Sequence, residues 1–530
     1  MNESEPKRYK SPRRKLVKFF EKSRNQWKAK CIDAKAMVKM LKNRIRYLEA
    51  SKNEWKSKAI ELEQELARMK AQENRESQPE VKKNGEITES APCAALFAQV
   101  PRYHTYTIGH IWLFLTLVLS SVVSLRSSSR TLEVVLPFFG YSCASPSWYA
   151  GRFWLLRLGY YKLMRPKQQA DDWVWIIDHT VQLGVEKCLL ILGVRLSDLP
   201  SDLTLKHEDV EPIALYPVTS SNGEVVFQQL EETIEKTGLP RAIVADQGSD
   251  VKSGIESFIQ AHPTTSYLYD IKHKTAALLK QYLHQDETWK RFTQLAAQTK
   301  SQVQQTAIAF LAPPNQRTKA RYMNLEVLLR WTQRALVVLD RLEERTDTRA
   351  SHEKIKTKLG WLTQFREPIK EWEALCQSAI TAARFVREQG VWNDCELELA
   401  QCFDLGVASP KTLQFQEQLL EFVKAESLKA QPGERLLGSS EIIESVLGKM
   451  KRLEQDQAKS GFTGLILGAA AIVSHTTHEV VTQAMETIPT KKVTEWVKNK
   501  LGQSLQSKRN IAFLTTPGAE QKRDQLLDSI

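Results

Sequence analysis

The sequence predicts a multidomain α/β protein with a mixed-sheet core and a large all-helical insertion, preceded by a coiled coil and a helix-turn-helix-like domain. Its 530 residues exceed what one ordinary core accommodates, and 42% hydrophobic with 26% charged residues is typical of globular domains. Short apolar runs alternate with amphipathic segments in residues 169–283, whereas residues 284–432 show mainly helical periodicity. A heptad repeat near the N-terminus completes this outline.

The N-terminal part divides into a basic tail (residues 1–25), a coiled coil (26–70) and a polar linker (71–100). Residues 1–30 hold eleven Lys or Arg against three Glu, a local charge that attracts a polyanion; the alternative is a solvated tail without a partner. One heptad position is occupied by Trp27, Ala34, Leu41, Leu48, Trp55, Leu62 and Met69, and the other by Cys31, Val38, Ile45, Lys52, Ala59 and Leu66. Because only Lys52 is polar, residues 27–69 predict a homo-oligomer, unless this helix packs on the same chain.

Residues 101–168 predict a small helical domain. Residues 108–125 are nearly long enough and apolar enough for a membrane span, but they contain His110 and three serines, and no basic stop follows. We therefore expect a buried core helix and no membrane contact, with a span as the alternative.

Two further helices in this region have the spacing of a helix-turn-helix. The first is expected over residues 129–139, and the second begins after Ser145-Pro146 and stops at Gly159. The second helix of such a motif enters the major groove of DNA, which would make Ser147, Arg152 and Arg157 DNA-binding residues. Any helical hairpin has the same pattern, so a purely structural hairpin is the alternative.

Residues 169–283 predict the first part of a sheet core. The predicted elements are strands over 173–178, 187–194 and 213–218, a helix over 224–236, a strand over 241–246, a helix over 250–261, a strand over 265–269 and a helix over 272–283. The first and fourth strands end in Asp178 and Asp246, where a buried run meets solvent. Residues 284–432, with Trp289 and Trp372 among their anchors, predict the helical insertion.

The rest of the chain predicts a final helix with C-terminal helices (433–505) and a tail (506–530). Ser439 and Ser440 precede a helix on which Ile443, Val446, Leu447 and Met450 face the core, leaving Glu444 at the border of that face. Glu441 is explained by its place in the first turn. Gly448 would let DNA approach this edge, where Lys449 and Lys451 are predicted phosphate contacts.

Three carboxylates, Asp178, Asp246 and Glu444, are the predicted catalytic residues and metal ligands. Two divalent cations about 3.5 to 4 Å apart need carboxylates on rigid neighbouring elements for phosphodiester chemistry. Asp250 is the alternative to Asp246, and plain solvated strand ends are the alternative to both. Residues 475–479 (HTTHE) have a metal-like spacing but no third ligand, which favours a surface helix.

The motifs that carry these acids resemble those of DDE transposases of bacterial insertion sequences, which have a ribonuclease H-like core of the retroviral-integrase superfamily. The similarity extends over roughly residues 100–480, and its motifs are residues 175–180 (WIIDHT), 243–250 (IVADQGSD), 270–273 (DIKH) and 438–445 (GSSEIIES). The resemblance implies two Mg²⁺ or Mn²⁺ ions on Asp178, Asp246 and Glu444. It also implies that Asp270 and His273 support these ligands or contact DNA; the alternative is an aspartate that caps the helix and a satisfied core histidine.

The function implied by this resemblance is metal-dependent DNA cleavage and strand transfer. The expected partners are double-stranded DNA, both transposon ends and target, and further copies of the chain. Seven scattered cysteines without paired spacing favour a reducing compartment, here the cytoplasm and its nucleoid. The alternatives are a non-catalytic DNA-binding regulator on a decayed ribonuclease H-like scaffold and a membrane-anchored coiled-coil scaffold.

Overall fold

The computed structural model describes residues 96–138, 140, 144–181, 186–316, 322–342, 352–403, 409–455, 462–502 and 505–513. The predicted basic tail and coiled coil, almost all of the linker and most of the C-terminal tail lie outside these residues.

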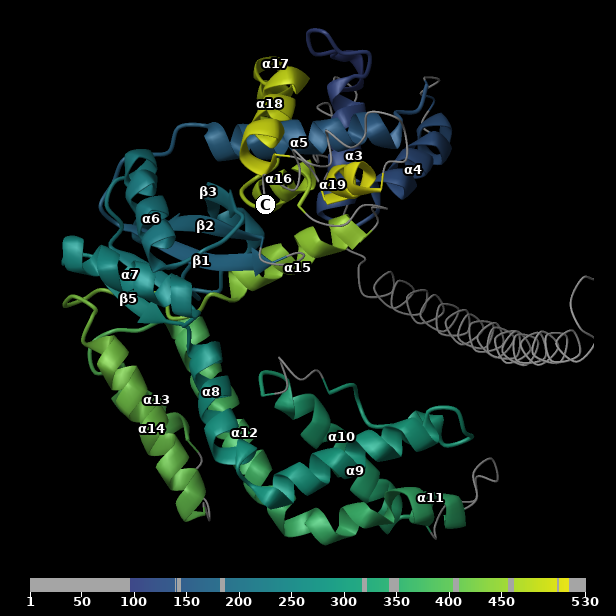
Figure 1. Ribbon diagram of the computed structural model, residues 1–530, viewed down its shortest axis with the longest axis vertical. Helices are drawn as coiled ribbons and strands as arrows, with labels where there is room; N and C mark the ends of the chain where they lie inside the picture. Colours follow the sequence, from purple (N-terminus) through teal and green to yellow (C-terminus); the bar gives the residue numbers. More distant parts are fainter. Residues whose placement is uncertain are drawn as a thin grey trace, which may run out of the picture. The chain divides into compact units, whose positions relative to one another are not determined.

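A five-stranded mixed sheet forms the core (Figure 1). Its strands are β1 (Trp173–Val181), β2 (Lys187–Arg195), β3 (Glu211–Val218), β4 (Ala242–Ala245) and β5 (Ser266–Tyr269), in the spatial order β3-β2-β1-β4-β5. The pairs β1–β2 and β2–β3 are antiparallel, whereas β4 is parallel to both β1 and β5. Each predicted strand is present, and the order of strands and helices along the chain is the predicted one.

Alternation along the strands gives the sheet two buried faces. Trp175 and Ile177 of β1 pack with α6 (Gly223–Thr237) and α7 (Ser249–Ala261), which lie against each other. Val174 and Ile176 point to the opposite face and join the main core of the molecule. On that side α15 (Glu441–Gln455) contacts β1, and α5 (Trp148–Met164) contacts β3.

Segments distant in sequence form one helical layer around α5. This helix contacts α3 (Ile108–Leu119), α4 (Leu125–Phe138), α16 (Leu467–Ile472), α17 (His478–Thr487) and α18 (Thr490–Leu501). A short turn, η5 (Gly464–Ile466), precedes α16, and α19 (Leu505–Ala512) follows α18. Residues 101–168 are therefore not a separate domain, contrary to the prediction, because residues 462–501 share their core.

The apolar segment 108–125 supplies a core helix, as expected. Ile108, Ile111, Phe114 and Leu115 of α3 have no exposed surface. Within the described parts of the chain, no helix is both long and apolar enough to cross a membrane.

Gly159 does not end α5, as the sequence suggested, but lies inside it. A Cβ atom at this position would lie 2.0 Å from the carbonyl oxygen of Leu467 in α16. The glycine therefore permits close contact between two helices, and α5 continues to Met164 because Arg165 is the first residue to leave the helical conformation.

Helices follow one another from α8, the last predicted helix of the core, through the predicted insertion at residues 284–432. These helices are α8 (Ile271–His284), α9 (Glu287–Val303), α10 (Leu325–Asp340), α11 (His352–Leu359), α12 (Arg366–Gln389), α13 (Cys395–Cys402) and α14 (Pro410–Ser427). Trp372 packs on Trp289 and Phe292 at ring-centroid distances of 4.8 and 4.9 Å, so an aromatic cluster joins α9 to α12. Helix α12 also lies along α8, and after α14 the chain returns to the sheet as α15 (Figure 1).

Candidate active site

Asp178 and Asp246 lie on two neighbouring inner strands of the sheet. Asp246 directly follows β4, as predicted, whereas Asp178 lies within β1, which continues to Val181 beyond the predicted end. Ile177 of β1 pairs with Ala245 of the parallel strand β4, so the next residue of each chain segment is an aspartate. Neighbouring strands lie about 4.8 Å apart, which brings the two backbones together. Since Ile177 and Ala245 face α6 and α7, alternation turns both aspartates toward the opposite face, where α15 contacts β1.

The turn after β4 holds Asp246 through its neighbours. The backbone N–H of Gly248 donates to Asp246 Oδ1 at 3.0 Å, and the hydroxyl of Tyr267 donates to the Asp246 carbonyl at 2.7 Å. A side chain at position 248 would crowd this carboxylate, because a Cβ there would lie 3.2 Å from Oδ1.

The carboxyl group of Asp178 has a strongly altered acidity. Its pKa is raised to about 7, mainly by burial. The negative charges of Asp246 and Glu444 contribute to this increase. The His273 side chain and the backbone N–H of His179 act in the opposite direction. Three carboxylates from β1, β4 and α15 therefore interact through space at one end of the sheet, although 198 residues separate the last two.

Glu444 is half-buried on the face of α15 that borders the core. Its Oε2 lies 2.8 Å from Lys272 Nζ, and its Oε1 lies 3.9 Å from His273 Nε2. Glu441 shares Lys272 with Glu444, at 3.2 Å, and has a further partner in Arg387 of α12 at 3.5 Å. Of these two glutamates, Glu444 is the one whose charge acts on Asp178.

Asp270 joins the start of α8 to the start of α15. Its Oδ1 accepts from the backbone N–H and the Nδ1 of His273 at 2.7 and 2.9 Å, and its Oδ2 accepts from the N–H and hydroxyl of Ser440 at 2.6 and 3.0 Å. Burial alone would raise its pKa, but these donors hold the pKa of Asp270 below its usual value. Asp270 is fully buried, so it supports the site and cannot contact DNA.

His273 completes this arrangement. Burial would lower its pKa, but the Asp270 carboxylate and the charges of Glu444 and Asp246 raise it. The His273 imidazole, which is hydrogen-bonded to Asp270, thus lies between Asp270 and the candidate metal ligands. The hydroxyl of Ser440 binds Asp270 instead of capping α15, and Ser439 Oγ accepts from the Glu441 N–H at 3.3 Å.

Asp250, the alternative to Asp246, is engaged elsewhere. Its Oδ2 accepts from Lys187 Nζ at 2.6 Å and lies 3.4 Å from His179 Nδ1. Burial opposes the effect of these partners, but they hold the pKa of Asp250 below its usual value. This carboxylate therefore binds the start of α7 to β2.

The residues of α5 that were predicted to bind DNA do not lie on an exposed recognition helix. Arg157 donates to His104 Nε2 at 2.8 Å and to the carbonyl of Met485, and burial lowers its pKa to about 10. Arg152 is also desolvated, and Ser147 caps the helix by accepting from the Ala150 N–H at 3.2 Å. Because five helices and β3 surround α5, it is a packing helix and not an exposed recognition helix, and Arg157 is a structural residue.

Lys449 and Lys451 lie on α15 beyond Glu444. Lys449 is half-buried and burial lowers its pKa, whereas Lys451 and Arg452 are exposed. Gly448 faces open space, since a Cβ there would have no neighbour within 4 Å. The predicted approach to this side of the helix is therefore sterically free within the described structure.

The donor set at this end of the sheet suits a hard cation, because Asp178, Asp246 and Glu444 offer only carboxylate oxygens. Among the residues that the structure describes, no group of three or more His, Cys, Asp or Glu side chains has the arrangement of a metal site. His478 of the HTTHE segment forms an ion pair with the adjacent Glu479 at 2.7 Å, in keeping with a surface helix.

Lys272, Arg387 and the role of the Ser440 hydroxyl were not predicted from the sequence. Lys272 lies inside the DIKH motif, so its position next to His273 was a usable signal. Arg387 carried no such signal, because 54 residues separate it from Glu441 and only the packing of α12 brings them together.

No family model matches this chain, and no curated protein matches it. Among solved structures, it is similar to a chain of the "Drosophila P element transposase strand transfer complex" with a TM-score of 0.37 and 14% sequence identity. The similarity covers 71% of this chain and 94% of that chain. At this TM-score the likeness gives no support to a functional assignment, which depends on the carboxylates themselves.

Proposed function

We propose that this protein is a DDE-type transposase with a ribonuclease H-like core that cuts and joins DNA at a two-metal carboxylate site. The observation that carries the proposal is the approach of Asp178, Asp246 and Glu444, in which the charges of the other two help to raise the pKa of Asp178. Carboxylates crowded in this way are costly unless a cation compensates them. The sheet order and the helical insertion between β5 and α15 support the same assignment.

Asp178, Asp246 and Glu444 would hold two Mg²⁺ or Mn²⁺ ions, with Asp270 and His273 fixing the approach of α15. Such ions, when bound, lower the pKa of water and stabilise the leaving oxygen. In the proposed reaction, water attacks phosphorus at a transposon end and a 3′-oxygen departs. The freed 3′-hydroxyl then attacks target DNA and displaces a second 3′-oxygen, so the chain itself forms no covalent bond.

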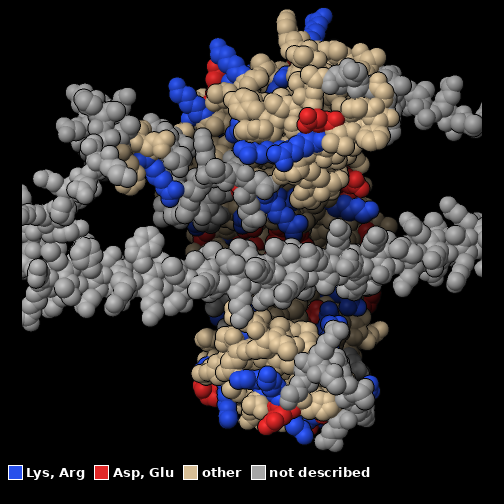
Figure 2. Space-filling view, turned by 90° about the vertical axis from the view of Figure 1, so that its right-hand side faces the viewer, with Lys and Arg blue, Asp and Glu red and all other residues tan. Residues whose placement is uncertain are grey.

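Double-stranded DNA is the proposed substrate and partner, in the form of transposon ends and target. The formal net charge is +13, and Figure 2 shows Lys and Arg side chains over the upper and lower parts of one face, with Asp and Glu side chains among them. Lys449, Lys451 and Arg452 follow Glu444 on α15, so they are candidate phosphate contacts beside the catalytic residues. A bacterial insertion-sequence origin, nucleoid association and oligomerisation through residues 27–69 belong to the same proposal.

The direct test uses DNA duplexes carrying the sequences that flank the gene, with Mg²⁺ or Mn²⁺. We expect metal-dependent strand cleavage in the wild type and loss of at least about 100-fold in Asp178→Asn, Asp246→Asn and Glu444→Gln. Binding should remain, because it depends mainly on cation-phosphate contacts. Glu441→Gln is the matched comparison for Glu444→Gln, and at saturating metal it should retain most cleavage. Binding without cleavage in the wild type would support the non-catalytic regulator instead.

A further inference from the structure

Lys272 is shared between two carboxylates with different roles. Its ammonium group lies 2.8 Å from Glu444 and 3.2 Å from Glu441, and it is half-buried. The side chains of the two glutamates are 32% and 40% exposed, so neither pair is strongly screened or fully desolvated. The Lys272 ammonium therefore occupies one oxygen of a proposed metal ligand.

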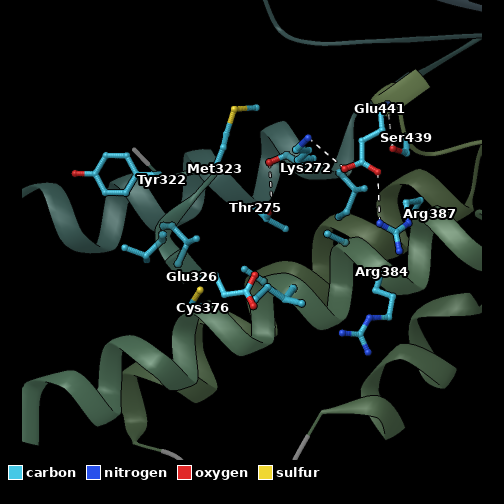
Figure 3. A pocket seen from close by; sticks show the side chains of 16 residues that line it. Lys272, Thr275, Tyr322, Met323, Glu326, Cys376, Arg384, Arg387, Ser439 and Glu441 are labelled. Atoms are coloured by element: carbon cyan, nitrogen blue, oxygen red, sulfur yellow. Dashed lines mark hydrogen bonds and ion pairs between the residues drawn. The ribbon is translucent and has the colours of Figure 1, made fainter. Parts of the chain in front are cut away.

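Glu441 is in turn anchored by the helical insertion. Arg387 of α12 lies 3.5 Å from Glu441 Oε2, while Lys272 contacts Oε1 of the same carboxylate. Figure 3 shows these ion pairs in sequence, from Arg387 to Glu441 to Lys272, at the wall of a cavity of about 300 Å³ between α8, α10 and α12. The cavity provides space for the Lys272 side chain on the Glu441 side.

A divalent cation and an ammonium group compete for the same carboxylate, because each is stabilised by the same negative charge. Glu444 can serve as a metal ligand with both oxygens only if Lys272 gives up Oε2. Glu441 offers Lys272 a second partner at nearly the same distance, so the ammonium need not be left unpaired.

We propose that Lys272 is a positioning residue that holds Glu444 before metal binding and transfers to Glu441, the acid anchored by Arg387, when metal binds. This inference rests on the proposed two-metal site. It gives Glu441 a role distinct from that of a ligand, and it connects the helical insertion to the catalytic carboxylate through three consecutive ion pairs.

The experiment measures Mn²⁺ binding to the full chain by electron paramagnetic resonance or calorimetry, without DNA. Lys272→Met should bind Mn²⁺ about three- to tenfold more tightly, because the competing charge is gone. Glu441→Gln should bind it more weakly by a similar factor, because Lys272 then stays on Glu444. The double variant should resemble Lys272→Met, since Glu441 acts only through Lys272.

Lys280→Met is the matched control, because it removes the same charge from an exposed position of α8 and should leave Mn²⁺ affinity unchanged. Weaker or unaltered binding by Lys272→Met, or an effect of Glu441→Gln that persists in the double variant, overturns the transfer while leaving the two-metal site intact. Wild-type protein that binds no Mn²⁺, or binding that is unaffected by Asp178→Asn and Glu444→Gln, overturns the proposed function as well. Thermal unfolding of each variant verifies that it is folded.

Discussion

Asp270 has no exposed surface. Its carboxylate joins the start of α8 to Ser440, which lies 170 residues later in the sequence, just before α15. Each carboxylate oxygen of Asp270 accepts two hydrogen bonds. Removal of the carboxylate would take away the acceptor of the Ser440 N–H. The location of Glu444 follows from this connection, because Ser440 is one turn before it on α15.

We expect Asp270→Ala to lower the free energy of unfolding by about 3 kcal/mol, because buried donors of His273 and Ser440 lose their acceptor. Ser440→Ala removes one hydroxyl donor but keeps the backbone N–H, so it should cost only about 1 kcal/mol. Urea unfolding of both variants measures the difference. Equal losses of stability in Asp270→Ala and Ser440→Ala would show that the hydrogen bond from the Ser440 backbone N–H contributes little.

His273 makes stability depend on pH in a defined direction. Its folded-state pKa is raised above 6.5 by Asp270 and, more weakly, by Glu444 and Asp246, although burial opposes this. The folded state thus binds the proton more tightly than the unfolded state, so the contribution is complete below pH 6.5 and is lost as pH rises through the raised pKa.

The difference in unfolding free energy between wild type and His273→Gln should therefore be largest in acid and shrink above pH 6.5. Unfolding from pH 5 to 9 in a metal chelator measures it. A difference that grows with pH would mean that the neutral imidazole is the stabilising form.

At the scale of secondary structure, the strands could be predicted, although β1 continues past Asp178, whereas the partners of helices could not. The apolar runs before Asp178 and Asp246 have strand length and end at polar residues, and this local pattern is sufficient to locate both. The pattern of α5 fits a recognition helix and a core helix equally well. Residues 462–501 pack against α5 and distinguish the two possibilities, but the sequence of α5 alone does not identify them as its partner.

Lys162 illustrates this dependence on distant segments. Its fully buried ammonium donates to the carbonyls of Ala471, Val473 and Ser474 at 3.2, 2.7 and 3.0 Å and to Thr476 Oγ1 at 2.7 Å. Burial lowers its pKa to about 7, but a protonated amine has three N–H groups for these acceptors.

We expect Lys162→Met to cost about 3 kcal/mol or more of stability, since three buried carbonyls lose their donor. Thr476→Val removes a single acceptor and should cost about 1 kcal/mol. Chemical denaturation of the two variants compares them. Unchanged stability of Lys162→Met would show that water replaces the ammonium as the donor to the carbonyls of Ala471, Val473 and Ser474.

For the whole molecule, the order of strands and helices and the helical insertion follow from periodicity along the chain. The fusion of residues 101–168 with 462–501 into one layer does not, because sequence spacing contains no information about which surfaces meet. The same limit explains why Asp178, Asp246 and Glu444 could be chosen from the sequence while Lys272 and Arg387 were not connected to them.

Assembly of the complete protein is predicted to depend on residues 27–69, which lie outside the described structure. Deletion of residues 1–75 should lower the oligomeric state without unfolding the remainder, because a coiled coil has its own core. Light scattering compares the assembly of the two proteins, and thermal unfolding verifies the shorter one. Identical masses per assembly would contradict the heptad interpretation.

The distance in sequence between Asp246 and Glu444 also determines when the site can exist. A ribosome makes the two aspartate strands first and then about 150 residues of helical insertion before α15 is complete. During that interval Ser440 has not been synthesised, so the Asp270 carboxylate lacks two of its hydrogen-bond donors. Chains are synthesised at about 5 to 20 residues per second, and domains generally fold in order of synthesis. A nascent chain would thus have its aspartates in place for about 10 to 40 seconds before Glu444 is made, so the proposed two-metal site can form only after α15 has been synthesised.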